Sequence, residues 1–277
     1  MMTIYQQRAE RFRALHQQAD LLVLPNPWDA GSAKMLASLG FQALATTSAG
    51  LAFSLGRRDA EGAVSREEAL LNARAIVEAT SLPVAADLEN GYGDSPETCA
   101  DTVRLAAEAG LVGGSIEDAS GRCEAPIYDF ERAVERIQAS VEAARNLAFP
   151  FTLTARAENF LHGRADLDDT IRRLVAYAEA GADVLYAPGL SEREQIIEVV
   201  RAVAPKPVNI LVGSPSLQLS LPELAELGVK RVSLGSNLAR VAFGAFLQAA
   251  TALAERGDLS GAQQALPFDR INDLFRN

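Results

Sequence analysis

Short apolar segments recur along this 277-residue chain, and each is followed by a stretch with helical periodicity. Several of these segments are almost continuously apolar, which is typical of parallel strands covered by helices. The alternation of strand and helix predicts successive βα units. We predict strands at residues 21–25, 43–47, 83–87, 113–117, 151–155, 183–187, 207–211 and 231–234, and helices at 65–80, 96–110, 128–147 and 168–181.

Eight βα units without a long linker favour a closed (β/α)8 TIM barrel, a fold that spans about 250 residues as one domain. An open doubly wound sheet would show the same alternation and stays an alternative. No change in composition marks a second domain, so we predict one domain over residues 1–277, with the barrel at about 20–236. The residues before the first strand are expected to form a helix that caps the barrel floor.

The C-terminal segment, residues 237–277, is longer than the last helix of a barrel needs. Its stretch SNLARVAFGAFLQAATAL (236–253) is mostly apolar. We predict an extended helix that lies in the core or packs on a neighbouring subunit.

Charge and composition exclude several classes of protein. The net charge of −10 argues against a general binder of nucleic acid or of anionic membranes, since both require a basic surface. No apolar run reaches the ~20 residues that span a bilayer, and the polar N-terminus does not resemble a signal peptide. The two cysteines form neither a metal-ligand cluster nor a disulfide framework, so we expect a cytoplasmic protein.

Acidic residues follow two neighbouring strands at the end where barrel enzymes carry their chemistry. Asp87 and Glu89 are two apart on a segment expected to be extended, so both side chains can point the same way. Glu117, with Asp118 beyond it, ends the next strand. Converging carboxylates are costly without a cation between them. Hard oxygen ligands of this kind suit Mg²⁺, with Mn²⁺ also possible, although solvated loop acids would give the same pattern.

A basic residue and a small-residue turn lie at other strand ends. Arg156 faces the acidic group, as a structural counter-ion or as a bidentate ligand of a substrate carboxylate, and we favour the second. Ser48, Ala49 and Gly50 offer backbone N–H groups for a carboxylate or an oxyanion.

Other chemistries have no residues to perform them. The three lysines, Lys34, Lys206 and Lys230, all lie away from the C-terminal strand ends, which argues against a Schiff-base enzyme. His162 is the one histidine near such an end, so a multi-histidine metal site is excluded. The chain contains neither GxGxxG nor GxxxxGK[ST].

The segment DLENGYGD (87–94) resembles the DxDxGYG signature of the isocitrate lyase / phosphoenolpyruvate mutase superfamily, with Glu89 in place of the second Asp. Four further blocks stand in the order of that superfamily, and the resemblance covers roughly residues 20–250. These blocks are LGRRD (55–59), SIED (115–118), TARAEN (154–159) and PVNIL (207–211).

The resemblance implies a Mg²⁺ ion held directly by Asp87 and through water by Asp59, Glu89 and Glu117. It implies that Ser48, Ala49 and Gly50 grip the carboxylate and oxo groups of a small-molecule substrate, that Arg156 faces this substrate and that Asn209 lines the pocket. Catalysis would involve Arg156, Glu117 and Ser48. It also implies a pyruvate-enolate-type intermediate and exchange of the C-terminal helix in a homo-oligomer, a dimer or a tetramer.

One loop departs from the pattern of the lyases in this superfamily. Those lyases carry a KKCGH-like loop after the fourth strand, whereas this chain has a short loop around Cys123 without the Lys, Gly and His. We therefore predict a lyase or decarboxylase that cleaves a C–C bond of a small 2-oxo or 2-hydroxy carboxylate such as an oxaloacetate-like acid. The short loop argues against cleavage of isocitrate or methylisocitrate. The alternatives are P–C bond chemistry on a phosphonopyruvate-like acid and a non-catalytic 2-oxo-acid-binding protein.

Overall fold

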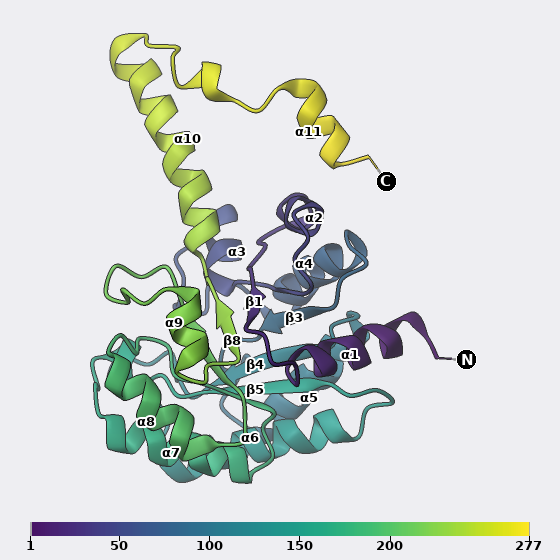
Figure 1. Cartoon of the computed structure of the whole chain (residues 1–277), viewed down its shortest axis with the longest axis vertical. Coiled ribbons are helices and arrows are strands. Elements are labelled where there is room, and N and C mark those ends of the chain that lie inside the picture. The colour runs from purple at the N-terminus through teal and green to yellow at the C-terminus, as the bar shows by residue number, and fades with distance from the viewer. Residues whose placement is uncertain (1, 277) are drawn as a thin grey trace.

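The computed structural model describes residues 2–276 and shows a (β/α)8 barrel (Figure 1). All strand pairs are parallel, in the order β1-β8-β7-β6-β5-β4-β3-β2. The remaining gap, between β1 and β2, is bridged where Ala45 N donates to Pro25 O at 3.1 Å. The strands therefore form a nearly closed barrel, and the open sheet considered above is wrong.

Each predicted strand and helix is present, within one or two residues of its expected ends. The strands are β1 Leu22–Leu24, β2 Leu44–Ala45, β3 Val84–Asp87, β4 Gly113–Glu117, β5 Thr152–Arg156, β6 Val184–Tyr186, β7 Val208–Leu211 and β8 Arg231–Ser233. The helices are α1 Ile4–Leu15, α2 Ala30–Ser38, α3 Ser48–Ser54, α4 Arg66–Glu78, α5 Pro96–Glu108, α6 Phe130–Arg145, α7 Leu167–Glu179, α8 Arg193–Val203, α9 Leu221–Glu226, α10 Asn237–Arg256 and α11 Phe268–Leu274, with short 3₁₀ turns at Asn159–His162 and Ala262–Gln264.

Side-chain caps decide where several barrel helices begin. Ser65 accepts a hydrogen bond from Glu68 N, and the Glu68 side chain accepts one from Ser65 N in return. Ser95 accepts from Thr98 N, and Pro96 occupies the first turn of α5, where its missing N–H costs nothing. These caps fix the start of α4 and α5, and hence the length of the loops that lead from the strands into them.

Helix α1 closes the floor of the barrel, as expected. Its face carrying Ala9, Phe12 and Leu15 is buried among residues that point into the lower end of the barrel, including Leu24 and Val112. Phe12 is completely buried, so its removal would leave a cavity under the barrel. The apolar face of α1 therefore covers the lower end of the barrel core.

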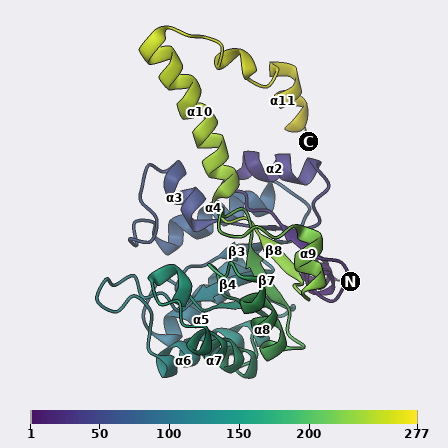
Figure 2. The ribbon, with the colours of Figure 1, turned by 60° about the vertical axis from the view of Figure 1, so that its left-hand side comes forward.

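The C-terminal segment forms an arm that leaves the barrel after β8 (Figures 1 and 2). Helix α10 stands away from the barrel and buries only Ala239 and Ala252. The arm then turns back, and the end of α11 reaches α2, where Lys34 Nζ donates to Phe275 O at 3.4 Å. Exposed apolar side chains line this arm, namely Val241, Phe243, Phe246, Leu247, Leu253, Leu259, Leu266, Phe268 and Phe275.

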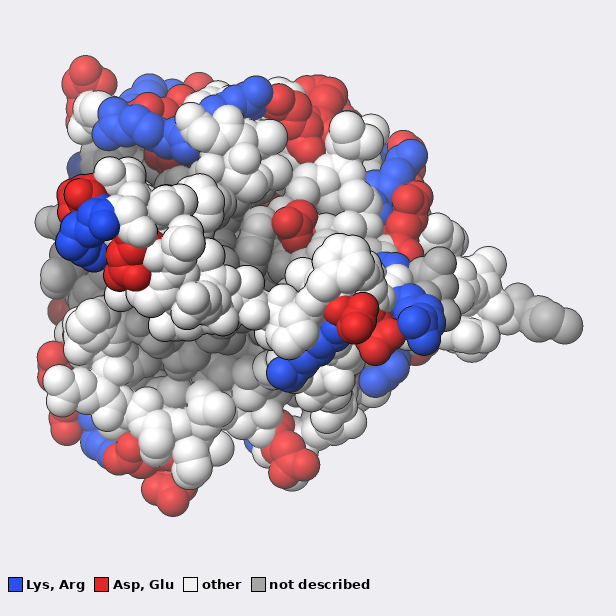
Figure 3. Space-filling view, turned by 90° about the horizontal axis from the view of Figure 1, so that it is seen from above, with Lys and Arg blue, Asp and Glu red and all other residues white. Residues whose placement is uncertain are grey.

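An apolar surface of this extent is rare on a protein that works alone. Seen from the end where α10 emerges, uncharged side chains cover much of the centre of this face, and charged ones lie mainly toward its edges (Figure 3). No helix within residues 2–276 is long and apolar enough to cross a membrane. The exposed apolar side chains of the arm are suited to contact with another protein surface.

We expect the arm to hold two or more copies of the chain together. Phe246 and Leu247 are 71% and 64% exposed, so replacing both with glutamate leaves the barrel core untouched and places charge in the proposed interface. Analytical ultracentrifugation at micromolar concentration should show an oligomer for the wild type and a monomer for Phe246→Glu/Leu247→Glu. A monomeric wild type would contradict the expectation.

Candidate active site

Side chains from strands β3 to β8, and from the loops that follow β1 and β2, surround a cavity of about 220 Å³ at the C-terminal ends of the strands. This is the end of the barrel at which α10 emerges (Figure 1). The lining includes six residues proposed from the sequence: Ser48, Ala49, Asp59, Asp87, Arg156 and Asn209. The eight-stranded barrel therefore brings together residues that are up to 161 positions apart, because every strand points the same way.

Arg156, the last residue of β5, is the centre of the charged groups here. Its Nη1 lies 2.8 Å from Asp87 Oδ1 and 2.9 Å from Glu117 Oε2. Its Nη2 and Nε lie 2.8 and 2.9 Å from Glu158 Oε1. Its guanidinium carbon is also 5.2 Å from the ring centre of Tyr186. One arginine thus contacts three carboxylates in a largely buried position.

The acids outnumber this arginine, and their pKa values reflect it. Burial, together with the charges of Asp87 and Asp59, raises the pKa of Glu89 to about 7. Burial and the charge of Asp87 also raise the pKa of Asp59. Burial raises the pKa of Glu117 well above its ordinary value, against the opposing effect of Arg156. Negative charge is therefore in excess around Asp87, and a cation bound there would relieve it.

The donor set fits a magnesium ion. In the part of the chain that the structure describes, no group of three or more His, Cys, Asp or Glu side chains is arranged to coordinate a metal directly. Mg²⁺ does not need such a group, because it commonly takes one or two protein carboxylates and keeps several waters. Asp87 lines the cavity, and Asp59, Glu89 and Glu117 lie close enough for its charge to add to the effect of burial on their pKa values. One direct ligand with acids that act through water agrees with this arrangement.

The turn at residues 48–50 begins helix α3 beside Asp87. Ser48 Oγ donates to Asp87 Oδ2 at 2.9 Å, and Ser48 N lies 3.4 Å from the same oxygen. Ala49 lines the cavity. Gly50 does not, and its N–H donates to the capping Thr47 Oγ1 at 3.2 Å. A Cβ at Gly50 would come within 2.6 Å of Thr47 Cγ2, so the glycine is required for close packing behind the cavity.

The backbone around Glu89 differs from the sequence expectation. Strand β3 ends at Asp87, and Glu89 has a φ of 47° in a turn closed by Gly91 N donating to Leu88 O at 2.8 Å. Asp87 and Glu89 therefore do not lie on one extended segment. Glu89 instead borders a neighbouring cavity of about 540 Å³, which Glu117 also lines. Neither Glu89 nor Glu117 is among the residues that line the smaller cavity.

Asp118, which follows Glu117, has a structural role. It is 2% exposed, and its carboxylate accepts hydrogen bonds from Arg173 Nη1 at 2.9 Å, Tyr177 Oη at 2.7 Å and Glu158 N at 2.8 Å. These contacts tie β4 and β5 to α7. The sequence alone does not distinguish this acid from its neighbour, because both lie at the end of the same strand.

Sequence reasoning missed several residues of the site. Glu158 contacts Arg156 directly, and its pKa is raised to about 7, first by burial, with Arg156 opposing the shift. Glu158 lies in the TARAEN block (154–159), two residues after Arg156, and this position was the sequence signal that could have identified it. Ser115 Oγ lies 3.5 Å from Asp87 Oδ1. Tyr186 and Arg231 also line the cavity, although nothing in the pattern of β6 or β8 marked them.

Cys123, in the short loop after β4, is exposed and is not among the residues that line either cavity. The loop folds back on itself, with Ser120 N donating to Pro126 O at 2.9 Å. Arg122 pairs with Asp94 at 2.9 Å, which holds the loop against the segment after β3. Cys99, the second cysteine, is buried in α5.

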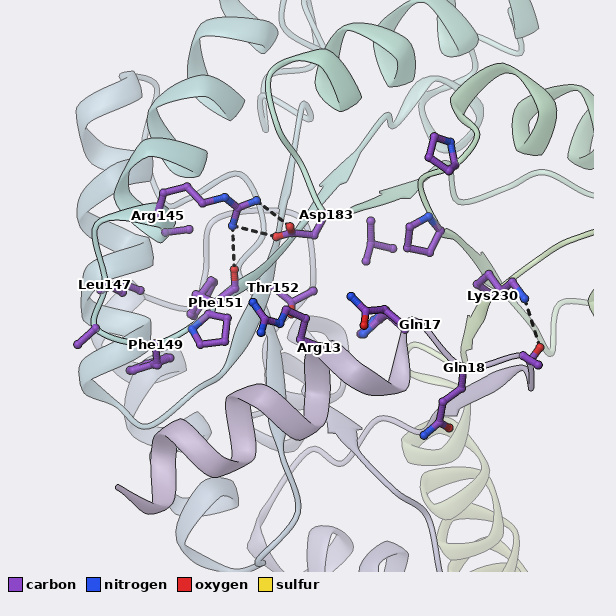
Figure 4. Close-up of a pocket in the computed structure, with 18 residues that line it drawn as sticks. Arg13, Gln17, Gln18, Arg145, Leu147, Phe149, Phe151, Thr152, Asp183 and Lys230 are labelled. Carbon is purple, nitrogen blue, oxygen red and sulfur yellow. Dashed lines mark hydrogen bonds and ion pairs between the residues drawn. The ribbon is translucent and has the colours of Figure 1, made fainter. Parts of the chain in front are cut away.

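A larger cavity, of about 1010 Å³, lies at the opposite end of the barrel (Figure 4). It is bordered by residues that start or precede strands, such as Thr152 and Lys230, and by the end of α1. Its charged groups are satisfied within the protein: Arg145 pairs with Asp183 at 2.7 Å, and Lys230 donates to Ala19 O at 3.2 Å. The candidate site at the C-terminal ends of the strands is smaller, but it holds the group of acids around Arg156.

Comparison with known proteins places this chain in a family. The model of the family described as phosphoenolpyruvate phosphomutase matches residues 12–254. An uncharacterized protein of Mycobacterium tuberculosis is 35% identical over 226 residues, which are 81% of this chain and 81% of that protein. The 2,3-dimethylmalate lyase of Eubacterium barkeri is 29% identical over 276 residues, covering 96% of this chain and 93% of the lyase.

Solved structures extend the similarity to the whole fold. A protein of Burkholderia cenocepacia, described only provisionally as a lyase or mutase, shares 57% identity with a TM-score of 0.95, over 99% of this chain and 97% of that one. Oxaloacetate acetylhydrolase in complex with oxalate shares 26% identity with a TM-score of 0.86, over 98% and 94% of the two chains. Both the family match and the fold agree with the motifs around Asp87, and the chain belongs to the phosphoenolpyruvate mutase / isocitrate lyase superfamily.

Proposed function

We propose that this protein is a Mg²⁺-dependent enzyme that cleaves a C–C bond of a small 2-oxo or 2-hydroxy carboxylate. The observation that carries the proposal is the group of acids around Arg156, in which Asp87 lies at the edge of a substrate-sized cavity with Ser48 and Ala49. Similarity to 2,3-dimethylmalate lyase and to oxaloacetate acetylhydrolase supports the reaction class.

Asp87 would hold the metal directly, and Asp59, Glu89 and Glu117 would hold it through water. The ion would supply a positive charge where an enolate oxygen develops negative charge. Mn²⁺ has the same ligand preference and would be an acceptable substitute. Ser48 donates its hydroxyl to Asp87 and so fixes the orientation of that carboxylate.

Arg156 would orient the substrate carboxylate beside these acids. Its three carboxylate contacts keep it charged, because they outweigh the effect of burial and raise its pKa well above the ordinary value. They also restrict its rotamer, so a substrate meets a preorganised guanidinium. Ser48 and Ala49 contribute the first turn of α3 to the same wall of the cavity. Asn209, buried in β7, would form the opposite wall.

Turnover of a panel of oxo and hydroxy acids with and without Mg²⁺ tests the proposal. The panel includes oxaloacetate, 2,3-dimethylmalate, 2-methylisocitrate and phosphonopyruvate. We expect metal-dependent release of a 2-oxo acid or a shorter carboxylate from one of the C–C substrates. Phosphate or phosphoenolpyruvate formed from phosphonopyruvate alone would favour the P–C alternative, which the phosphomutase family match supports. Saturable binding without turnover would instead identify a binding protein.

Cys123 is expected to have little role in the chemistry. Removal of a general acid or base costs about 10²–10⁴ in rate. The Cys123 side chain is exposed and lies outside both cavities at this end of the barrel, so we expect Cys123→Ser to lose less than about tenfold in kcat. Steady-state kinetics on the best substrate checks this. A collapse of kcat would show that the loop closes over the site and would restore a lyase mechanism that depends on a cysteine.

We also propose that the enzyme acts as a homo-oligomer, a dimer or a tetramer, in the cytoplasm. The exposed apolar arm supports the first statement. The presence of a free thiol on the surface, at Cys123, supports a reducing compartment.

A further inference from the structure

Arg231, the first residue of β8, lies inside the barrel and is 5% exposed. Its guanidinium donates to three neutral groups: Nε to Asn209 Oδ1 at 2.8 Å, Nη2 to Thr154 Oγ1 at 3.0 Å, and Nη1 to His16 Nε2 at 3.3 Å. Within residues 2–276, no carboxylate forms an ion pair with it. Arg231 is thus a buried cation whose charge no acid of the described chain balances, which is an expensive arrangement.

The neighbouring histidine does not change this balance. His16 Nδ1 lies 2.8 Å from Phe12 O, so it carries the proton and leaves Nε2 free to accept from Arg231. Burial, followed by the charge of Arg231, lowers the pKa of His16 to about 3, and the histidine is therefore neutral at physiological pH. Burial also lowers the pKa of Arg231, to about 10, which still leaves the guanidinium charged.

Arg231 and Arg156 border the same cavity but differ in their surroundings. Arg156 is in contact with Asp87, Glu117 and Glu158, so its charge is more than neutralised by the protein. Arg231 has a full positive charge and, on each terminal nitrogen, a second N–H beyond the one already donated. Positive potential therefore lies on the Arg231 side of the cavity, and negative potential lies on the Asp87 side.

We propose that Arg231 is a specificity-determining residue that recognises a second carboxylate of the substrate. A dicarboxylate would place its 2-oxo or 2-hydroxy carboxylate end beside Asp87 and Arg156 and its other carboxylate on the Arg231 side. The bound anion would supply the counter-charge that the protein itself omits. This inference rests on the proposed function for the identity of the first end, and it names the residue that would recognise the other carboxylate.

Matched ligands test the charge directly. Malate and 2-hydroxybutyrate have the same four-carbon 2-hydroxy acid skeleton and differ by a carboxylate in place of a methyl group. Isothermal titration calorimetry with Mg²⁺ present compares both ligands on the wild type, Arg231→Gln, Arg231→Lys and the surface control Arg193→Gln. Circular dichroism and thermal unfolding check that each variant is folded.

We expect the wild type and Arg193→Gln to bind malate at least tenfold more tightly than 2-hydroxybutyrate. Arg231→Gln removes one partner of a buried charge pair, so we expect it to weaken malate binding by about 30-fold or more. The affinity for 2-hydroxybutyrate should change by less than about threefold. Arg231→Lys keeps the charge but not the planar fork, so we expect it to retain most of the preference for malate.

Two outcomes overturn the assignment of Arg231. The first is a wild type that does not distinguish the two ligands, which needs no variant to fold. The second is an equal loss of affinity for malate and for 2-hydroxybutyrate in both Arg231→Gln and Arg231→Lys. That result would show that Arg231 only holds Asn209 in place. Turnover is measured separately: if malate binding depends on Arg231 but no acid of the panel is cleaved, the proposed reaction fails and the role of Arg231 stands.

Discussion

Asp87→Ala is expected to abolish Mg²⁺-dependent turnover while the barrel stays folded. A metal acting as a Lewis acid supplies several kcal/mol of stabilisation to a developing anion, and each 1.36 kcal/mol is a factor of ten in rate. The loss should therefore reach about a thousandfold or more. The fold should survive because Arg156 keeps its contacts with Glu117 and Glu158 and because one carboxylate fewer reduces like-charge repulsion.

Two measurements separate this expectation from a general loss of structure. Isothermal titration with Mg²⁺ should show binding to the wild type and none to Asp87→Ala, whereas the unfolding temperature should be unchanged or higher. Asp101→Ala is the matched control, since Asp101 is an exposed acid on α5 that pairs with Arg104. Full metal-dependent turnover by Asp87→Ala would show that the assignment of the metal site is wrong.

Arg156→Ala is expected to lower both activity and stability. Without the guanidinium, a substrate carboxylate has no partner on this side of the cavity, and loss of such a buried pair costs about 2–5 kcal/mol. Three carboxylates would also lose their shared cation, since Asp87, Glu117 and Glu158 all contact it. Breaking a buried ion pair on one side destabilises a protein by about 3–5 kcal/mol. We therefore expect kcat/KM to fall by about 30-fold or more.

The comparison with other variants makes this prediction specific. Arg172→Ala removes an arginine that is 59% exposed and should leave kcat/KM and the unfolding temperature near the wild-type values. Arg156→Lys keeps the charge but cannot contact three carboxylates at once, so an intermediate loss is expected. Near-normal kinetics for Arg156→Ala, together with a collapse for Cys123→Ser, would reverse the roles proposed for these two residues.

The predicted part of the site depends on residues at strand ends. Asp87, Glu117 and Arg156 each end a strand, and parallel strands in a barrel all end at the same face, so the sequence order was enough to bring them together. Gly50 and Glu89 lie beyond strand ends, in turns whose geometry local pattern does not specify. The structure places Gly50 behind the cavity and gives Glu89 a left-handed backbone, and neither placement follows from residue type.

The sequence by itself determined the succession of eight βα units, because alternating apolar strands and amphipathic helices can bury their apolar faces in very few ways. It also determined the acidic strand ends and the polar turn that follows the second strand. Only the tertiary structure decided that the strands close into a barrel and do not form an open sheet. The tertiary structure also decided which acid contacts which cation. Glu117 and Asp118 are adjacent, yet Glu117 forms an ion pair with Arg156 and Asp118 forms one with Arg173. The reason is that successive residues at a strand end point to opposite faces of the sheet. In the sequence, Arg231 is an ordinary charged residue at the start of a predicted strand. Only the closure of the barrel buries it beside Asn209 without a carboxylate partner within residues 2–276.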